Sequence, residues 1–345
     1  MKNIYYNIHE LLGIKISSLS WHLIKDLNCL YSYFEGKGDS VPDISVEIGH
    51  FVPDLSECFS LDHKYFIKKD FIFVEDNDKK LRWKVQIEGL EQERMRIKFL
   101  TPKTTYARFP WMFFPDLVLH IYVLQPLIEM LLLRKGCMLV HAGAVSRKGK
   151  SYLIAGRGGS HKTNFVMGLM KRGYNYISDD MVILNGKEVL SFPHSVSLFD
   201  FAYRYLGRED MNLLEKVRLF FFLRKSQPLS FKVVERSKIE GLTLLILTNK
   251  PSIEVRNDFD RQGALRMLLF NQMMERTSYV SHKTIIGKYL EAYRFVFPDS
   301  KLFANEKERE KLLERSFQDV PFKVVEVPRR WESHFIEKLE IGQKE

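Results

Sequence analysis

The stretch that decides the fold is residues 152–184, YLIAGRGGSHKTNFVMGLMKRGYNYISDDMVIL. It opens with a short apolar run, breaks into a glycine-rich turn at residues 156–161, and continues from Lys162 as a helical pattern. A second apolar run follows and ends at two adjacent acidic residues, Asp179 and Asp180. A strand, a glycine-rich loop, a helix, a second strand and paired carboxylates, in this order, are the parts of a nucleotide-phosphate site.

The glycine-rich turn matches most of the phosphate-loop template G-x-x-x-x-G-K-[ST]. Gly156 takes the first position, Lys162 the lysine and Thr163 the hydroxyl, whereas His161 replaces the last glycine. Such a loop points backbone N–H groups and a helix N-terminus at the phosphates, while its lysine reaches the β- and γ-phosphates and its hydroxyl binds Mg²⁺. The predicted nucleotide-contacting residues are Gly156, Arg157, Gly158, Gly159, Ser160, His161, Lys162 and Thr163.

His161 is the main departure from the template, because it puts a side chain where the template has none. Histidine is among the residues enriched at positive φ, so this position can still adopt a loop backbone of the required kind. The alternative is an ordinary glycine-rich turn that binds nothing. The context favours a site, because a helix of about ten residues and a strand of about five would return Asp179 and Asp180 to the loop. For Asp179 and Asp180, the alternative to a role in the site is that they lie in a solvated turn after a strand.

His141 is a third candidate site residue. It lies in an apolar run, residues 137–145, which we predict to be a strand. The turn-like segment RKGK at residues 147–150 separates this run from the strand before the loop, and the spacing fits a tight antiparallel pair. A histidine in an apolar strand is usually a hydrogen-bonded core residue. The pattern therefore leaves a structural and a functional interpretation of His141 open.

The composition is that of a globular protein. The chain has 345 residues, of which 45% are hydrophobic and 28% charged, and its formal net charge is +10. A positive surface favours anionic partners such as nucleotides, phosphorylated substrates, acidic peptides or nucleic acid, although a solvated lysine-rich surface explains the charge equally well. Aromatic and basic stretches such as residues 218–225 keep an RNA-directed enzyme as a minor alternative. No RNA-binding motif is visible, so nucleic acid is an unlikely partner.

Cysteine usage and hydropathy indicate the compartment. Cys29, Cys58 and Cys137 lie far apart with no CxxC pair, which argues against a disulfide framework or a structural zinc site and for a reducing compartment. The N-terminus lacks the uninterrupted apolar core of a signal peptide. The most membrane-like stretch, residues 109–133, is too polar to span a bilayer comfortably. We therefore expect a cytoplasmic protein with no membrane partner.

The rest of the chain predicts an N-terminal region rich in strands and a mixed α/β region after it. Residues 1–40 look helical at first and then loop-like, and residues 44–101 show short runs of period-2 alternation typical of antiparallel strands. Residues 117–133 have apolar side chains at helical spacing, with Asp116 as the expected N-cap and Gly136 as the expected end.

After the loop segment, we expect further strands and helices that complete an α/β core. Strand and loop are predicted at 189–201, strands at 229–237, 239–249 and 321–328, and helices at 209–224, 261–279, 283–297 and 306–316. Residues 242–247 form a continuous apolar run, as expected of a strand buried on both faces.

Three segments together resemble the C-terminal catalytic domain of the HPr kinase/phosphorylase family and its broader relatives. They are VHAGAV at residues 140–145, YLIAGRGGSHKT at 152–163 and RGYNYISDDMVIL at 172–184. The resemblance is specific over residues 136–185 and looser at 241–248 and 321–327. It implies an α/β fold with a P-loop nucleotide-binding core, similar also to that of phosphoenolpyruvate carboxykinase. The first 115 residues have no recognisable counterpart in the bifunctional enzyme.

The resemblance implies ATP- and Mg²⁺-dependent phosphorylation of a hydroxyl, typically of serine. On this basis Lys162 would clamp the phosphates, and Thr163 and Asp180 would hold the metal. Asp179 would orient or deprotonate the acceptor hydroxyl, and His141 matches the family's active-site histidine. Asn164 stands where the bifunctional enzyme typically has an acidic residue, and the later glycine-rich signature of that enzyme is not found. HPr itself is therefore an unsafe guess for the acceptor.

These patterns divide the chain into a β-rich accessory or substrate-recognition region, residues 1–115, and an HPr-kinase-like P-loop catalytic domain, residues 116–345. The predicted function is a kinase that transfers the γ-phosphate of ATP to a hydroxyl of a small molecule, peptide or protein. The main alternative is a nucleotide-binding sensor or scaffold, with a degenerate loop and no kinase activity. Oligomeric state is left open, although the kinase family often assembles into rings.

Overall fold

The structure is a computed structural model, and the chain in it divides into two compact units. It describes residues 1–19, 30–37, 41–78, 81–100, 119–193, 196–207, 228–274, 284–303 and 306–338, and in addition 212, 214, 215, 218, 219 and 222. The first unit comprises Met1–Lys135 with Glu275–Lys307, and the second Gly136–Met274 with Glu308–Glu345. Each unit is mixed α/β, with a sheet of parallel and antiparallel strands. In the described part of the chain, no helix has the length and apolarity that a membrane span requires.

Among the described residues, the sheet of the first unit has the strand order β1-β2-β3-β8-β7-β6-β5-β4. Strand β3 runs parallel to both β2 and β8, and the other neighbours are antiparallel. The strands are β1 (Lys2–Ile8), β2 (Leu12–Ser18), β3 (Ile44–Ile48), β4 (Phe59–Leu61), β5 (Tyr65–Lys68), β6 (Phe71–Asp78), β7 (Leu81–Glu88) and β8 (Met95–Leu100). The strand-rich prediction for residues 44–101 is confirmed for the described part of that range. The expectation of antiparallel strands is wrong for β3, which is parallel to both of its neighbours.

The helical start predicted for the N-terminus is wrong, because β1 and β2 form an antiparallel hairpin there. Ile4, Tyr6 and Ile8 are buried and alternate with more exposed residues, which is the period of a strand with one face in the core. His9 and Glu10 make the turn with φ values of 52° and 60°. Non-glycine residues rarely adopt such values, so the turn carries no obvious sequence signal.

The helices of the first unit are α3 (Gln125–Arg134), preceded by a π-helical turn η3 (His120–Leu124), and α8 (Ile285–Val296), with short 3₁₀ turns η1 (Ser32–Phe34) and η4 (Lys301–Phe303). The helix predicted at 117–133 is confirmed in its described part, and Gly136 follows its end at φ 73°. The predicted N-cap Asp116 lies outside the described residues.

Helix α8 packs on β5 and β6, which is why the first unit includes a segment from late in the chain. The buried indole of Trp83 donates to the Tyr289 hydroxyl (3.0 Å), which in turn donates to Asp76 Oδ2 (3.0 Å). The compact units therefore differ in extent from the division predicted between residues 115 and 116. The roles assigned to the two parts stay predictions.

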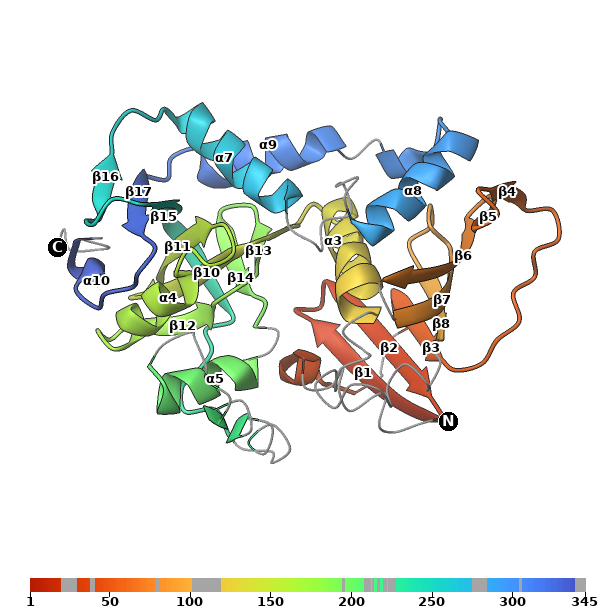
Figure 1. Ribbon diagram of the computed structural model, residues 1–345, viewed down its shortest axis with the longest axis horizontal. Coiled ribbons are helices and arrows are strands. Elements are labelled where there is room, and N and C mark those ends of the chain that lie inside the picture. Colours follow the sequence, from red (N-terminus) through yellow and green to blue (C-terminus); the bar gives the residue numbers. More distant parts are fainter. Residues whose placement is uncertain are drawn as a thin grey trace. The chain divides into compact units, whose positions relative to one another are not determined.

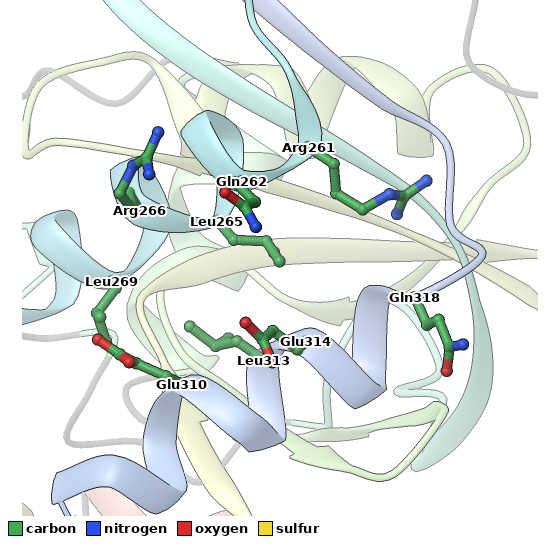
Figure 2. A pocket seen from close by; sticks show the side chains of 9 residues that line it. All are labelled: Arg261, Gln262, Leu265, Arg266, Leu269, Glu310, Leu313, Glu314 and Gln318. Carbon is green, nitrogen blue, oxygen red and sulfur yellow. The ribbon is translucent and has the colours of Figure 1, made fainter.

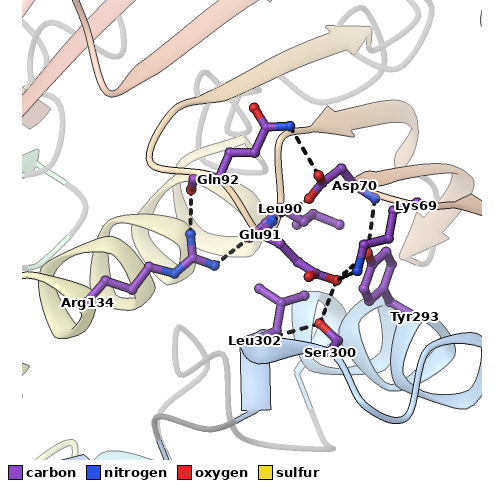
Figure 3. Close-up of polar contacts among 9 residues, drawn as sticks. All are labelled: Lys69, Asp70, Leu90, Glu91, Gln92, Arg134, Tyr293, Ser300 and Leu302. Carbon is purple, nitrogen blue, oxygen red and sulfur yellow. Dashed lines mark hydrogen bonds and ion pairs between the residues drawn. The ribbon is translucent and has the colours of Figure 1, made fainter.

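A polar cluster in the first unit joins two sheet turns to the helices (Figure 3). Glu91 Oε1 accepts hydrogen bonds from Lys69 Nζ (2.7 Å), the Tyr293 hydroxyl (2.9 Å) and the Ser300 hydroxyl (2.8 Å). The backbone N–H of Glu91 donates to Asp70 Oδ1 (2.7 Å). One carboxylate thus holds segments that are more than two hundred residues apart in the chain.

Among the described residues, the sheet of the second unit has the order β12-β10-β11-β15-β14-β13-β9, with β17 also pairing β15 and β16 pairing β17. Its strands are β9 (Met138–Val140), β10 (Ala142–Arg147), β11 (Lys150–Gly156), β12 (Asn175–Ser178), β13 (Val182–Asn185), β14 (Glu188–Ser191), β15 (Arg236–Thr248), β16 (Glu254–Arg256) and β17 (Phe322–Pro328). The long strand β15 is parallel to β11 and β17 and antiparallel to β14.

Helices cover the second sheet on both faces (Figure 1). The helices described in the second unit are α4 (Lys162–Met170), α5 (Val196–Tyr205), α7 (Arg261–Met273), α9 (Glu306–Phe317) and α10 (Phe335–Lys338). Helices α4 and α7 pack directly on the strands, whereas α10 packs on α4. A core cluster joins Ala142 and Ala144 of β10 to Leu268 of α7 and Leu313 of α9. Gly143, which points the other way, lies under α4, since a Cβ there would be 2.8 Å from Val166.

Several predictions for this unit hold, and three do not. The hairpin at 147–150, helices α7 and α9 and strand β17 are confirmed at the described residues, as is helix α8 of the first unit. Residues 189–201 include helix α5, which its aromatic content concealed, and residues 229–235 form no strand before β15. The strand predicted at 137–145 is two strands with different neighbours, β9 beside β13 and β10 beside β11 and β12. Most of the helix predicted at 209–224 lies outside the described residues.

Candidate functional site

The strand order brings the predicted site residues to one edge of the second sheet. Strand β10 is antiparallel to both β11 and β12, so β11 and β12 end at the same edge. Strand β11 ends at Gly156, which opens the glycine-rich loop (residues 156–161), and β12 ends just before Asp179 and Asp180. The register places Ala142 opposite Ala155, so His141 lies beside the end of β11.

The Lys162 side chain turns back into the glycine-rich loop. Its Nζ donates to the carbonyl oxygen of Gly156 (2.9 Å) and reaches that of Arg157 at 3.4 Å. The residue is only 6% exposed. The backbone N–H of Ser160 donates to Arg157 O (3.0 Å), and Gly159 has φ 78°. The loop is therefore a closed turn wrapped around the ammonium group of Lys162.

Gly156 is required by close packing. A Cβ at this position would lie 2.6 Å from Ser160 Oγ and 2.8 Å from the backbone oxygen of Leu245 on β15. A backbone atom cannot move aside as a flexible side chain can, so a larger residue would displace the start of the loop. The first glycine of the template is thus explained by the contact between the loop and the neighbouring strand.

His161 adopts the backbone conformation that the sequence predicts, with φ 66° and ψ 20°. Its Nε2 lies 3.2 Å from Pro328 O and 3.0 Å from Arg329 O, so the proton of this imidazole is on Nε2. The ring also packs on Trp331, with centroids 5.6 Å apart. The substitution that departs from the template therefore ties the glycine-rich loop to the chain that follows β17.

His141 lies at the break between β9 and β10, and not inside a strand as its apolar surroundings predict. Its Nε2 is 3.5 Å from Asp180 Oδ1, and its backbone N–H donates to Gln272 Oε1 (2.7 Å) on α7. The histidine side chain is 10% exposed and that of Asp180 43%. The structure thus brings His141 and Asp180 together at the edge where the glycine-rich loop begins.

Asp179 is held by a tyrosine that the sequence analysis did not single out. The buried Tyr176 hydroxyl donates to Asp179 Oδ1 (2.7 Å). Burial raises the pKa of Tyr176 well above its ordinary value, and the nearby Asp179 carboxylate adds to this effect. The phenol therefore stays protonated as a donor, and its ring is packed by Phe199 and Phe231 at centroid distances of 4.6 and 4.8 Å.

The residues at this edge that the sequence analysis missed differ in whether a local signal could have revealed them. Gln272 and Asn271 come from α7, more than a hundred residues after the glycine-rich loop, and Asn271 Nδ2 donates to Gly156 O (3.3 Å). Tyr176 lies three positions before Asp179 and could have been found from the segment NYISDD, because a residue at that spacing lies near the end of the same strand. Only the packing of α7 on the sheet identifies the two amides.

The predicted metal ligands are hard oxygen donors, as Mg²⁺ prefers. Thr163 lies in the first turn of α4, and the Asp180 carboxylate is partly exposed at the same sheet edge. Mg²⁺ is usually held by one or two carboxylates together with substrate phosphates and water. Among the described residues, no group of three His, Cys, Asp or Glu side chains could hold a metal ion. The residues present fit an ion that is bound mainly through a nucleotide.

A cavity of about 440 Å³ lies elsewhere in the second unit, between α7 and α9. Figure 2 shows Gln262, Leu265 and Leu269 on one side of it and Glu310, Leu313 and Glu314 on the other. The guanidinium of Arg261, at one end, donates to backbone oxygens of Phe317 and Val320. The lining of this cavity includes none of the predicted site residues, so the cavity is separate from the candidate site.

Comparison with known proteins gives little further help. No family model matches the chain, and no curated protein matches it either. Among solved structures, the HPr(Ser) kinase/phosphatase from Coxiella burnetii is similar at 15% identity, over 47% of this chain and 99% of that chain, with a TM-score of 0.21. This is a distant structural likeness, too weak to carry an argument about the activity of this chain.

Proposed function

We propose that this protein is an ATP-dependent phosphotransferase that acts on a hydroxyl of a small molecule, peptide or protein. The observation that carries the proposal is the meeting of four features at one sheet edge. The glycine-rich loop, Lys162, the Asp179–Asp180 pair and His141 come from three different strand ends of the second unit. Phosphoryl transfer depends mainly on positioning and charge neutralisation, and this edge supplies backbone donors, a cation and carboxylates together.

The phosphate donor would occupy the glycine-rich loop. Lys162 would exchange its contacts with Gly156 O and Arg157 O for phosphate oxygens, and the N-terminal N–H groups of α4 would point at the same phosphates. Thr163 and Asp180 would hold Mg²⁺. When bound, this ion neutralises the charge that develops on the transferred group.

The acceptor would lie on the β12 side of the loop, where the two aspartates are. Asp179 would orient the acceptor hydroxyl and take up its proton, because its carboxylate is held in place by the Tyr176 hydroxyl. His141, 3.5 Å from Asp180, would position that carboxylate. The acceptor oxygen would then attack the γ-phosphorus as the bond to the β-phosphate oxygen breaks, and ADP leaves.

The test is transfer of labelled γ-phosphate from ATP with Mg²⁺ to a panel of serine, related metabolites and serine-containing peptides. We expect Lys162→Ala to lower the rate by about a hundredfold or more, because a preorganised charge on the phosphates is lost. Lys171→Ala, at an exposed lysine directly after α4, is the matched control and should keep the wild-type rate. Full transfer activity in the Lys162→Ala protein would contradict the proposal.

A nucleotide-binding protein without transfer activity is the second candidate. Asn164 favours it, because an amide replaces the acidic side chain expected on the metal side of a kinase of this type. Calorimetric titration with ATP and Mg²⁺, combined with a hydrolysis assay, distinguishes the two functions. Tight binding with neither hydrolysis nor transfer would favour the sensor.

A further inference from the structure

A second cavity, of about 360 Å³, adjoins the glycine-rich loop on the side away from the aspartates. It exists because β11 leaves the sheet at Gly156, opposite Leu245, whereas β15 runs on to Thr248 beside β17. Helix α7 covers the space that this leaves. The lining residues are Gly156, Arg157, Leu244, Leu245, Ile246, Leu247, Met267, Phe270 and Asn271.

We infer that this cavity binds the nucleobase of the phosphate donor. The inference rests on the proposed function and deepens it. It gives a binding site to the nucleobase, whereas the glycine-rich loop is proposed to hold the phosphates. Gly156 and Arg157 belong to both the loop and the cavity lining, so one ligand can occupy the two together. The base and the γ-phosphate are opposite ends of a nucleoside triphosphate, and the cavity and the aspartates lie on opposite sides of β11.

The chemistry of the lining fits a flat ring with apolar faces and polar edges. Leucine, isoleucine, methionine and phenylalanine side chains dominate it, and Arg157 is the single charged residue among the described residues that line it. Ligand cavities of about 300–1,000 Å³ with apolar walls and a few polar groups are the usual kind, and this one lies at the lower end. A phosphate chain or a sugar would need more hydrogen-bonding groups than this lining offers.

Two side chains of α7 mark the cavity as a binding surface. Phe270 lines the cavity and is 61% exposed, so its ring is open to stacking by a base. Asn271 is 5% exposed, and its Nδ2 donates to Gly156 O while its Oδ1 has no hydrogen-bond partner among the described residues. Asn271 therefore holds the start of the glycine-rich loop against α7 at the wall of the cavity.

The experiment compares two ligands that share a triphosphate chain, ATP and inorganic tripolyphosphate, each titrated calorimetrically with Mg²⁺. We expect ATP to bind more tightly than tripolyphosphate. Phe270→Ala should weaken ATP about tenfold and leave tripolyphosphate unchanged, because only the base stacks on the ring. Met267→Trp, which fills the cavity, should have the same selective effect. Phe295→Ala, at a 78% exposed phenylalanine of α8 in the first unit, is the matched control for both ligands.

Photolabelling with 8-azido-ATP provides an independent test of where the nucleobase binds. We expect the label on residues 244–247 or 267–271, as identified by mass spectrometry. Equal affinities for ATP and tripolyphosphate, equal weakening of both by Phe270→Ala, or label confined to other segments would overturn the inference. If the wild-type protein bound neither ligand, the proposed function would fail as well, so the two failures are distinguishable.

Discussion

At the scale of single residues, the candidate site combines side chains that a sequence motif predicts with side chains and backbone atoms that position them. Lys162 is recognisable from its motif, but the carbonyl oxygens that it contacts in this state belong to the loop itself. His161 departs from the motif, yet its imidazole contacts two backbone oxygens and Trp331. Each of these side chains has a structural task that the motif alone does not specify.

His161 allows a test of loop strain without any assay of activity. Glycine relieves the roughly 1–2 kcal/mol cost of a left-handed backbone, whereas alanine keeps the Cβ and loses the imidazole contacts. We therefore expect His161→Gly to be more stable than His161→Ala by about 1 kcal/mol. Urea unfolding of the two variants beside wild type measures the difference. Greater stability of the alanine variant would show that the φ of 66° carries no strain.

Tyr176→Phe removes one hydroxyl and keeps a packed ring. The lost bond is a donor to a carboxylate, a type worth about 1.5–3 kcal/mol. If Asp179 must be held for transfer, the rate should fall roughly tenfold to a hundredfold, and the melting temperature should fall by several degrees because the bond is also lost from the folded state. Tyr203→Phe, in the same aromatic cluster, is the control for the substitution itself. An unchanged rate in Tyr176→Phe would remove Tyr176 from the positioning of Asp179.

At the scale of elements, close packing around α4 positions the loop. Gly143 of β10 lies beneath the helix, and Gly168 lies against Ile336 of α10, where a Cβ would come within 1.8 Å of Ile336 Cδ1. Arg172, just after α4, pairs with Glu337 of α10 at 3.2 Å. A helix that starts at Lys162 is therefore enclosed by the sheet on one side and by the C-terminal helix on the other.

A double-mutant cycle tests this packing. Gly168→Ala alone should destabilise the second unit by about 1–3 kcal/mol, because the new methyl group overlaps Ile336. In an Ile336→Ala background the same change should instead stabilise, by up to about 1 kcal/mol, because alanine is the better helix former. Chemical unfolding of the four proteins gives the cycle. Additive effects, within error, would mean that the two positions do not contact each other.

At the scale of the whole molecule, each unit depends on segments that return from late in the chain. In the first unit, Tyr293 and Ser300 reach the Glu91 carboxylate, together with Lys69 (Figure 3). Burial alone would raise the pKa of Glu91, but the hydrogen bonds from Lys69, Ser300 and Tyr293 outweigh it, so the pKa lies below its ordinary value. The stabilisation that the Glu91 carboxylate gives to the first unit is therefore lost at acidic pH.

The direction in which the stability of the first unit changes with pH follows from the lowered pKa of Glu91 in the folded state. The carboxylate stabilises the first unit above the unfolded pKa of about 4.3, and this contribution is lost as the pH falls through the lower folded pKa. We expect the protection factors of peptides from residues 71–78 and 81–90, corrected for the intrinsic pH dependence of amide exchange, to fall over that acid range in wild type. Glu91→Gln should show faster exchange at neutral pH and a weaker pH dependence. Glu47→Gln, at a partly exposed residue of the same sheet, is the control.

Local chemistry explains which parts of the fold and site could be predicted. The hairpin at 147–150, the end of α3 before Gly136 and the positive φ of His161 depend on neighbouring residues, and all three are confirmed. The N-terminal hairpin and helix α5 were missed, because their hydrophobic patterns are ambiguous and tertiary contacts decided between helix and strand.

By itself, the sequence determined the loop, its lysine and the carboxylate pair as a candidate phosphate site, since these residues are contiguous or one helix and one strand apart. Only the tertiary structure decided what surrounds them. The break at His141, the hydrogen bonds from Gln272 and Asn271 of α7 and the cavity beneath α7 depend on strand order and on contacts between distant segments. A local sequence pattern does not predict such contacts, because many residues elsewhere in the chain could contact the same side chain.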